Sequence, residues 1–283
     1  MRTMLKLGAL AAFIAFGSNS VAVAQDFKLP QPSPTQTISQ DFSLSNISVT
    51  YSRPSAKGRK IFGDLVPYGQ VWRTGANAST KIKFGETVTL NGQVVPAGEY
   101  ALYTIPEKNE WTFILSRNLT WWGSIGYKDA EDVVRFKAKP EKLPFMVETF
   151  TIAFGNQKPN SMDVSLVWAD LAVSFTVKTE IDSKIMASID AAMAGEKKPY
   201  FQAAAYYYEA GKDLNKALTW VNEAAKAQPN AYWIEHLKAK IQLKLGDKKG
   251  AITTAQSSMQ KAEAQQNPDY IALNQKFIAE AGK

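Results

Sequence analysis

Residues Leu171–Ala194 read LAVSFTVKTEIDSKIMASIDAAMA, and the spacing of apolar residues changes within this stretch. Apolar and polar residues alternate over Val173–Val177, which is typical of a half-buried β-strand. After about residue 180, apolar residues recur every three or four positions, as in an amphipathic helix. The stretch therefore predicts a β domain over residues 41–180, followed by a helical domain over residues 181–283.

The predicted β domain contains short β-branched and aromatic runs separated by turn residues. Asn91-Gly92 is a strong signal for a two-residue hairpin, and Ala169-Asp170 predicts a tight turn between the last two strands. Because no helical pattern separates the strands, an antiparallel β-sandwich or jelly-roll-like domain is favoured over a parallel sheet. The nine predicted strands are 47–51, 81–84, 87–90, 100–105, 111–115, 133–136, 146–154, 162–168 and 171–177.

The N-terminal residues have the pattern of a cleavable export signal, predicted over residues 1–24. Two basic residues precede the apolar run Leu7–Phe16, and Ala22-Val23-Ala24 fits the small-x-small cleavage pattern. We expect cleavage between Ala24 and Gln25 and a periplasmic or secreted protein. Residues 25–40 are rich in proline and polar side chains, which predicts an extended tether. No later segment has the eighteen or so apolar residues of a membrane span, so we expect none after cleavage.

The region after residue 180 has the composition of a helical repeat. Of its residues, 21 are alanine, and Ala217 and Asp213 recur 34 positions later as Ala251 and Asp247. This is the spacing of tetratricopeptide repeats, which the region resembles, and it predicts a small tetratricopeptide-like domain of about two hairpins and a capping helix. An ordinary alanine-rich bundle is the alternative. Such repeats bind proteins, and the residues predicted to contact a partner are Tyr206, Tyr207 and Trp233.

The composition excludes several kinds of chemistry. The chain has no cysteine and a single histidine, which excludes disulfides, a cysteine nucleophile, an iron–sulfur cluster and a multi-histidine metal centre. The net charge is +7, but no long run of lysine or arginine occurs, so nucleic acid is not an expected partner. We therefore expect no metal and no cofactor.

A long connection over residues 52–77 lies between two predicted strands. Unstructured loops of this length are usually functional or disordered, and its apolar content favours an ordered loop. In one interpretation, arginine, asparagine and aromatic side chains bind a carboxylate, a phosphate or a sugar. In the other, Trp72 belongs to the core while Arg73 and Asn77 bind backbone groups of the loop. The candidate ligand-binding residues are Arg53, Arg59, Tyr68, Trp72, Arg73 and Asn77.

This loop also carries a family resemblance. The string IFGDLVPYGQVWRTGAN, followed by PAGEYALYTIP, WTFIL, WWGSIGY, DVVRFKAKP and VETFTIAF, resembles the secreted bacterial family known as domain of unknown function 2911. The resemblance covers residues 41–179. It implies an exported β domain, often followed by a helical segment, and it implies no activity.

A second candidate site is Trp121-Trp122-Gly-Ser-Ile-Gly-Tyr127. Adjacent side chains of a strand point to opposite faces, so at most one of the two tryptophans can belong to the core. The other is suited either to carbohydrate stacking or to packing against the helical domain. Trp121, Trp122 and Tyr127 therefore join the candidate ligand-binding residues.

The sequence favours an exported binding or assembly protein that is not an enzyme. Its β domain is expected to bind a small polar ligand or an envelope glycan, and its helices to bind a protein. Two alternatives remain open. One is a metal-independent hydrolase of envelope carbohydrate, whose carboxylates sequence alone does not identify. The other is a purely structural subunit of the cell envelope.

Overall fold

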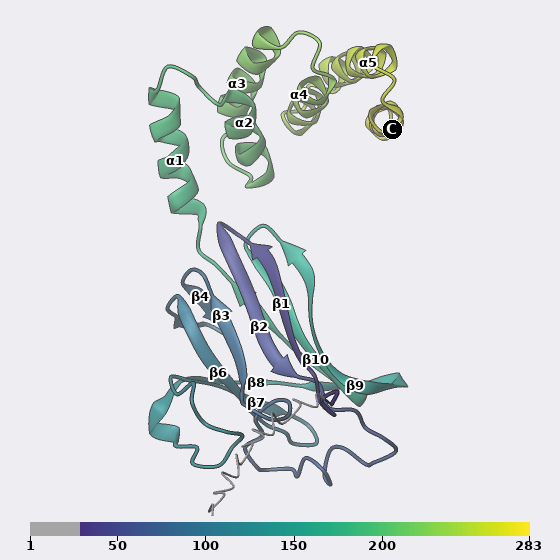
Figure 1. Cartoon of the computed structure of the whole chain (residues 1–283). Helices are drawn as coiled ribbons and strands as arrows, with labels where there is room; N and C mark the ends of the chain where they lie inside the picture. The colour runs from purple at the N-terminus through teal and green to yellow at the C-terminus, as the bar shows by residue number, and fades with distance from the viewer. Residues whose placement is uncertain (1–28) are drawn as a thin grey trace, which may run out of the picture.

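The computed structural model describes residues 29–283 and shows an antiparallel β unit followed by six α-helices (Figure 1). The predicted order of β and then α is thus confirmed. The predicted signal peptide, residues 1–24, and residues 25–28 lie outside the described part of the chain. The strands are β1 (Thr35–Phe42), β2 (Ser45–Ser52), β3 (Thr80–Phe84), β4 (Val88–Leu90), β5 (Gln93–Val95), β6 (Gly98–Ile105), β7 (Trp111–Ser116), β8 (Asp132–Ala138), β9 (Pro140–Lys158) and β10 (Ser161–Lys178).

The strands form two sheets with a shared aromatic core. A six-stranded sheet has the order β1-β2-β3-β6-β7-β8, and a four-stranded sheet has the order β5-β4-β10-β9. Along β10, Met162, Val164, Leu166 and Trp168 are buried, while the residues between them are half-buried. This alternation directs one face of each sheet inward, and large aromatic rings from both sheets fill the space between them.

The predicted tether is wrong for residues 35–40, which belong to β1. β1 pairs with β2 along its whole length, from Thr35 opposite Ser52 to Phe42 opposite Ser45. Gln36 accepts a hydrogen bond from the hydroxyl of Tyr51. As an edge strand, β1 leaves its other flank to solvent, which explains why its composition is polar.

Two predicted turns have different outcomes. Asn91 and Gly92 join β4 to β5 with φ angles of 47° and 82°, as a tight hairpin turn of the predicted kind requires. Ala169-Asp170 is not a turn between two strands. Instead β10 runs continuously past Ala169, whose φ of 53° coincides with a shift in the register against β9. The two predicted strands 162–168 and 171–177 are therefore one bent strand.

The helices are α1 (Asp182–Ala194), α2 (Tyr200–Glu209), α3 (Leu214–Ala227), α4 (Tyr232–Lys244), α5 (Lys248–Ala264) and α6 (Pro268–Ala281). From α2 onward consecutive helices pack on each other, and α4 also contacts α2 and α6. The residue pairs that are 34 positions apart in the sequence occupy equivalent positions in their helices. Asp213 caps α3 by accepting two backbone N–H bonds, and Asp247 caps α5 by accepting one. Both Ala217 and Ala251 are fully buried.

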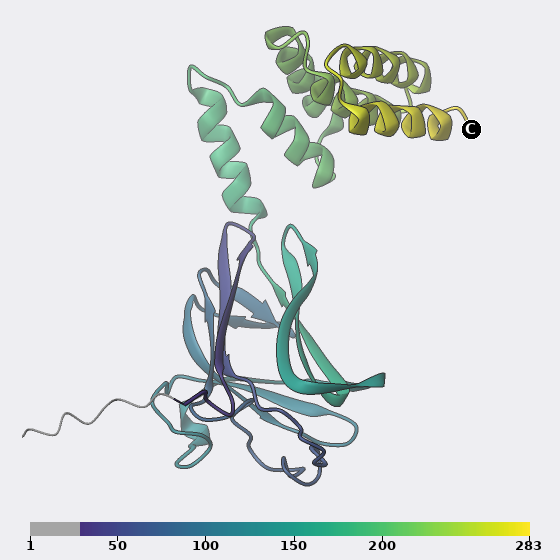
Figure 2. The same ribbon diagram turned by 45° about the vertical axis from the view of Figure 1, so that its right-hand side comes forward.

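The helices and the long loops lie at opposite ends of the sandwich. Helix α1 leaves the end of β10, and Lys184 forms an ion pair with Glu86 of the β unit, with 3.5 Å between Nζ and Oε2. In both views the segments 53–79 and 117–128 lie at the end away from the helices (Figures 1 and 2). Candidate residues of the β unit and of the helices therefore belong to separate surfaces.

Candidate functional site

The segment 53–79 between β2 and β3 is ordered around Trp72. The backbone of Trp72 pairs with Thr104 of β6, with N···O distances of 2.7 and 3.0 Å. Its indole Nε1 donates to the carbonyl of Gly75 at 3.1 Å. The ring stacks on Trp168 with centroids 6.0 Å apart and meets Phe150 edge-on at 5.2 Å. Trp72 therefore belongs to the core of the sandwich, although part of its ring reaches the surface.

Arg73 and Asn77 fix the backbone of the same segment. Nη1 of Arg73 donates to the carbonyl oxygen of Asn77 at 2.7 Å. The side-chain amide of Asn77 donates to the carbonyl of Ser33 at 3.2 Å and to the hydroxyl of Ser52 at 3.4 Å. Asn77 has a φ of 58°, a conformation that asparagine tolerates better than most residues. Asn77 therefore binds backbone and side-chain groups of the fold, as the structural interpretation predicts. Arg73 also binds the loop backbone, but its side chain is only half-buried.

A small cavity adjoins the exposed side of Trp72, and we call it the Trp72 pocket. It encloses about 260 Å³. Within residues 29–283, its lining includes two arginines and no carboxylate, and its walls are largely apolar. The lining residues are Ser33, Pro54, Arg59, Leu65, Val66, Trp72, Arg73, Gly75, Ala76 and Trp168.

The Trp72 pocket contains three of the predicted ligand-binding residues: Arg59, Trp72 and Arg73. The guanidinium of Arg59 is held at the rim because Nε donates to Ala56 O at 2.9 Å and Nη2 to Ser55 O at 2.7 Å. A guanidinium has five N–H donors, so each arginine has donors beyond these backbone contacts. An arginine pair without a carboxylate creates a positive potential over an apolar wall.

Arg53, Tyr68 and Asn77 do not line the Trp72 pocket. Arg53 fastens the segment to β9, since Nε donates to Phe150 O at 3.1 Å and Nη2 to the hydroxyl of Thr151 at 2.8 Å. Tyr68 lines two neighbouring depressions. Sequence reasoning missed Trp168 in the pocket wall. The apolar and polar alternation of Met162–Leu166, continued by two residues, is the signal that places Trp168 on the inward face of β10.

The Trp121–Tyr127 candidate forms a small aromatic cluster on the outer face of the six-stranded sheet. Trp121 and Tyr127 pack against the buried ring of Tyr103, with centroid distances of 6.2 and 5.3 Å. Trp122 is 66% exposed. The two tryptophans therefore differ in burial as predicted, although they lie in a loop and not in a strand. This loop is at the end away from the helices, which excludes packing against the helical part as the role of Trp122 (Figure 1).

Arg73 joins this loop to the Trp72 pocket. A Cβ at Gly123 would lie 2.7 Å from Nη1 of Arg73, so the guanidinium packs directly on the Gly123 backbone. The hydroxyl of Tyr103 donates to the carbonyl of Gly123 at 3.2 Å on the other side. Burial raises the pKa of Tyr103, and the charge of Arg73 opposes that shift. Trp122 therefore directly precedes Gly123, which contacts Arg73 in the wall of the Trp72 pocket.

Tyr127 belongs to a hydrogen-bonded group that stabilises the loop. Its hydroxyl donates to Oδ2 of Asp132 at 2.6 Å, and Arg135 donates both to that oxygen and to the Tyr127 hydroxyl, at 2.6 and 2.7 Å. Burial and the bond to Asp132 raise the pKa of Tyr127 well above its ordinary range. The phenol thus stays protonated, and the group positions the chain and provides no nucleophile.

The predicted partner residues of the helices are not equally accessible. Tyr207 is only 3% exposed and meets Trp220 edge-on at 4.7 Å, so its prediction as a partner contact is wrong. The hydroxyl of Tyr206 donates to Oδ1 of Asp182 at 2.7 Å, and burial together with this bond raises the pKa of Tyr206 to about 12. Trp233 is half-buried against Tyr232, with ring centroids 5.0 Å apart.

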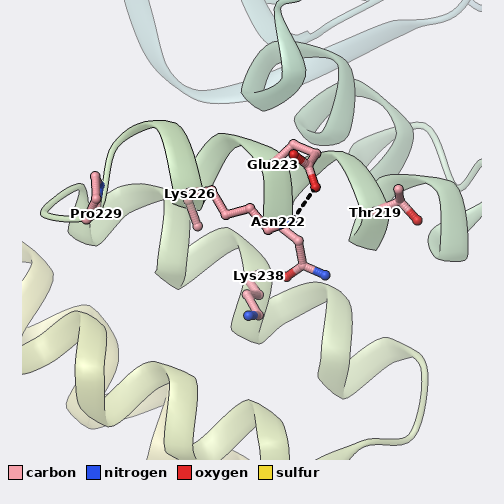
Figure 3. Close-up of a pocket in the computed structure, with 7 residues that line it drawn as sticks. Thr219, Asn222, Glu223, Lys226, Pro229 and Lys238 are labelled. Atoms are coloured by element: carbon pink, nitrogen blue, oxygen red, sulfur yellow. Dashed lines mark hydrogen bonds and ion pairs between the residues drawn. The ribbon is translucent and has the colours of Figure 1, made fainter.

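A shallow groove of about 490 Å³ lies between α3 and α4 (Figure 3). Asn222 of α3 points toward α4, where Lys238 lies. Lys226 forms an ion pair with Glu223, with 2.6 Å between Nζ and Oε1. None of the three predicted partner residues lines this groove, and its wide, polar lining has no buried binding group.

His236 is half-buried between α4 and α6 and does not lie on an open helix surface. Its Nδ1 is 2.8 Å from Oδ1 of the fully buried Asn274, and its ring meets Tyr270 and Phe277 edge-on. Burial lowers the pKa of His236 below its ordinary value of 6.5. A protonated imidazole is therefore less favourable in the folded helices than in the unfolded chain.

This pKa shift predicts a pH dependence of stability. Because the unfolded chain binds the proton more readily, the stabilisation is complete above the unfolded pKa of 6.5 and falls as the pH drops below it. We expect the wild type to lose more stability than His236→Gln between about pH 7.5 and about pH 5.5. Urea denaturation of both proteins measures this, and equal losses would contradict the prediction.

Residues 29–283 meet neither the requirements of a metal site nor those of a membrane-spanning helix. No group of three or more histidine, aspartate or glutamate side chains is placed to hold a metal ion there. No helix in the same range has both the length and the apolar character needed to cross a bilayer.

Comparison with known proteins gives one match. No curated protein and no solved structure matches the chain. The family described as "Protein of unknown function (DUF2911)" matches residues 33–177, which covers the β unit and the segment 53–79 together with the Trp72 pocket. This match spans half of the sequence. The chain therefore belongs to the DUF2911 family.

Proposed function

We propose that this is an exported binding protein whose Trp72 pocket takes a small organic anion and whose helices bind a protein. The observation that carries the ligand proposal is the lining of the pocket. Arg59 and Arg73 supply positive charge, and no carboxylate is among the described lining residues. Guanidinium groups bind carboxylates and phosphates through paired N–H donors, which matches this charge.

The walls favour an anion with an apolar body over a sugar. Trp72, Trp168, Leu65, Val66 and Pro54 provide apolar surface, and Ser33 is the uncharged polar side chain among the lining residues. A glycan presents many hydroxyls that need polar partners when buried. A monocarboxylate such as benzoate needs one charged partner and an apolar wall, which the pocket combines.

The lining of the pocket does not support the hydrolase alternative. A glycosidase requires two carboxyl groups on either side of the bond that it cleaves. Among residues 29–283, the Trp72 pocket has no carboxyl group in its lining. We therefore propose that the Trp72 pocket binds its ligand and does not hydrolyse it.

Arg59→Gln tests the ligand proposal with little risk to the fold. Its guanidinium contacts only nearby backbone carbonyls of its own loop, whereas Arg73 also packs on Gly123. We expect benzoate at about a hundred times its Kd to stabilise the wild type by about 2.7 kcal/mol, hence a rise of about 5–10 °C in melting temperature. Arg59→Gln is expected to lose most of this rise.

The matched control is Arg117→Gln, an exposed arginine outside the pocket, which is expected to keep the full rise. N-acetylglucosamine serves as the uncharged probe and inorganic phosphate as the anion without an apolar body. A rise with N-acetylglucosamine alone, or an equal loss in both variants, would contradict the proposal.

The proposal for the helices rests on their repeat-like arrangement. The two N-terminal caps at Asp213 and Asp247 and the contacts of α4 with both α2 and α6 support a tetratricopeptide-like stack. Where α2 meets α4, Lys240 and Lys244 place their ammonium groups 4.6 and 4.0 Å from the ring centroid of Tyr208. Lys240 also forms an ion pair with Glu209, with 3.4 Å between Nζ and Oε1, so the two lysines exceed the carboxylate by one positive charge. This aromatic surface with a net positive charge suits an acidic segment of a partner.

A glutamate-rich peptide tests the helical surface. We expect its binding to fall in the double variant Lys240→Ala/Lys244→Ala and to persist in Lys248→Ala/Lys249→Ala, which removes two lysines at the start of α5. Isothermal titration measures both affinities, and equal weakening would show a general charge effect.

N-terminal sequencing of the exported protein tests the export proposal, with Gln25 as the expected first residue.

A further inference from the structure

The end of the β unit away from the helices exposes large apolar side chains from three separate segments. Leu65 is 43% exposed, Trp122 is 66%, Ile125 is 83%, Phe145 is 60% and Met146 is 65%. They come from the segment 53–79, from the loop 117–128 and from β9. Exposed apolar side chains mark an interaction surface where they lie together, whereas isolated ones are common on any protein.

Phe145 and Met146 protrude because β9 carries extra residues against β10. Lys142 pairs with Leu171 and Val147 pairs with Ala169, so four residues of β9 lie opposite Asp170 alone. These four residues, 143–146, have no register partner in β10, and one of them is a proline without an N–H to donate. Figure 2 shows the corner of β9 and β10 projecting from the body of the sandwich.

Shared cavity walls join the three segments into one surface. Met146 of β9 lines a depression of about 440 Å³ together with Arg59 and Lys60. Arg59 also lines the Trp72 pocket with Leu65 and Arg73. Arg73 packs on Gly123, the neighbour of Trp122. Arg59 and Arg73 therefore connect Met146 and Leu65 with the loop that carries Trp122.

The charges of the depression beside Met146 favour an anionic surface. Arg59, Lys60 and Lys142 line it, and Asp170 is its one carboxylate within the described chain. Lys142 lies 3.9 Å from Asp170, which leaves the two cations of the segment 53–79 in excess. Each lysine or arginine close to an anionic bilayer adds to the attraction.

The entry point of the chain lies at the same end. The carbonyl of Ser33 accepts the amide of Asn77, and the carbonyl of Pro34 accepts the backbone N–H of Arg53. Twenty-eight residues precede Leu29, and they include the apolar run Leu7–Phe16.

We propose that the end of the sandwich formed by Leu65, Trp122, Ile125, Phe145 and Met146 docks on an anionic lipid bilayer. The apolar side chains stand singly or in pairs on three segments, and Arg59, Lys60 and Arg73 line the cavities beside Met146 and Leu65. Apolar side chains of this kind can enter the interface region of a bilayer, which needs no surface of matching shape. Tryptophan is favoured in that interface region. The docking is peripheral and needs no spanning helix.

Vesicle co-sedimentation tests this with the chain that begins at Gln25, which contains every described residue and lacks the apolar run Leu7–Phe16. The vesicles contain equal parts of phosphatidylglycerol and phosphatidylcholine. We expect Phe145→Ser/Met146→Ser to bind at least about tenfold more weakly than the wild type, because two apolar side chains no longer enter the interface. Wild-type binding is expected to weaken with added salt and on vesicles of phosphatidylcholine alone.

The matched control is Leu245→Ser/Leu273→Ser, which removes two exposed leucines from the helices and is expected to bind vesicles normally. Failure of the wild type to bind, or equal losses in both double variants, would overturn the proposal. So would an effect of Phe145→Ser/Met146→Ser on self-association by light scattering without any effect on vesicles. Benzoate is expected to stabilise this variant as it does the wild type, so the test is independent of the Trp72 pocket.

Discussion

Replacing Trp72 with alanine is expected to lower the free energy of unfolding of the β unit by about 3 kcal/mol. The ring stacks on Trp168 and also contacts Phe62, Trp111 and Phe150, so its removal leaves a void among four aromatic side chains. It also removes the indole bond to the Gly75 carbonyl. Urea denaturation followed by circular dichroism measures the loss.

Trp122→Ala is the matched control for this prediction. Trp122 lies in a loop with most of its surface in solvent, and its truncation is expected to change stability by no more than about 0.5 kcal/mol. Equal costs for the two substitutions would show that Trp72 is not part of the core. A large cost for Trp122 alone would reverse the roles that the structure gives to the two rings.

The strands that could be predicted are those with visible alternation or β-branched runs. β10 is an example, since its buried and exposed residues differ in polarity. β1 was missed because its sequence, TQTISQDF, is mostly polar. What holds it in place is backbone pairing with β2, which depends on the fold and leaves no pattern in the side chains. The bend at Ala169 was missed for a similar reason, because a positive φ at alanine has no compositional signal.

The candidate site could be predicted only in part. Arg59, Trp72 and Arg73 lie close together in sequence, and their residue types already suggest a site for an anion. Trp168 completes the pocket from a strand that is far away in sequence, so tertiary packing alone reveals it. The protrusion at Phe145 depends on a mismatch in length between two paired strands, which sequence does not show.

The sequence predicts that Tyr207 contacts a partner, which places this side chain on the open surface of α2. The structure instead buries Tyr207 together with Ala203 and Ala204. One residue is about 100° of rotation in a helix, so the error moves a side chain from the core to the neighbouring face. Tyr208 lies on that face, beside α4.

Tyr207→Ala is therefore expected to destabilise the helical part by about 3 kcal/mol, as for other large buried side chains. The ring packs edge-on against Trp220, and its hydroxyl accepts a hydrogen bond from Lys216 at 3.2 Å. Hydrogen exchange followed by mass spectrometry is the measurement, with peptides from α2 to α4 expected to exchange faster. Peptides from β6 and β7 are expected to keep their protection, because a single ion pair links α1 to the β unit among the described residues.

Tyr206→Ala is the control, since it removes the neighbouring tyrosine of the same helix. Its hydroxyl bonds Asp182 and its ring is half-buried against the helical core, so we expect a loss of stability that is smaller than that of Tyr207→Ala. If Tyr206→Ala proved the more damaging substitution, α2 would have to turn by one position and the contact with Trp220 would be wrong. If Tyr207→Ala also unprotected β6 and β7, the two parts would unfold as one cooperative unit, and the Trp72 pocket would then depend on the packing of the helices.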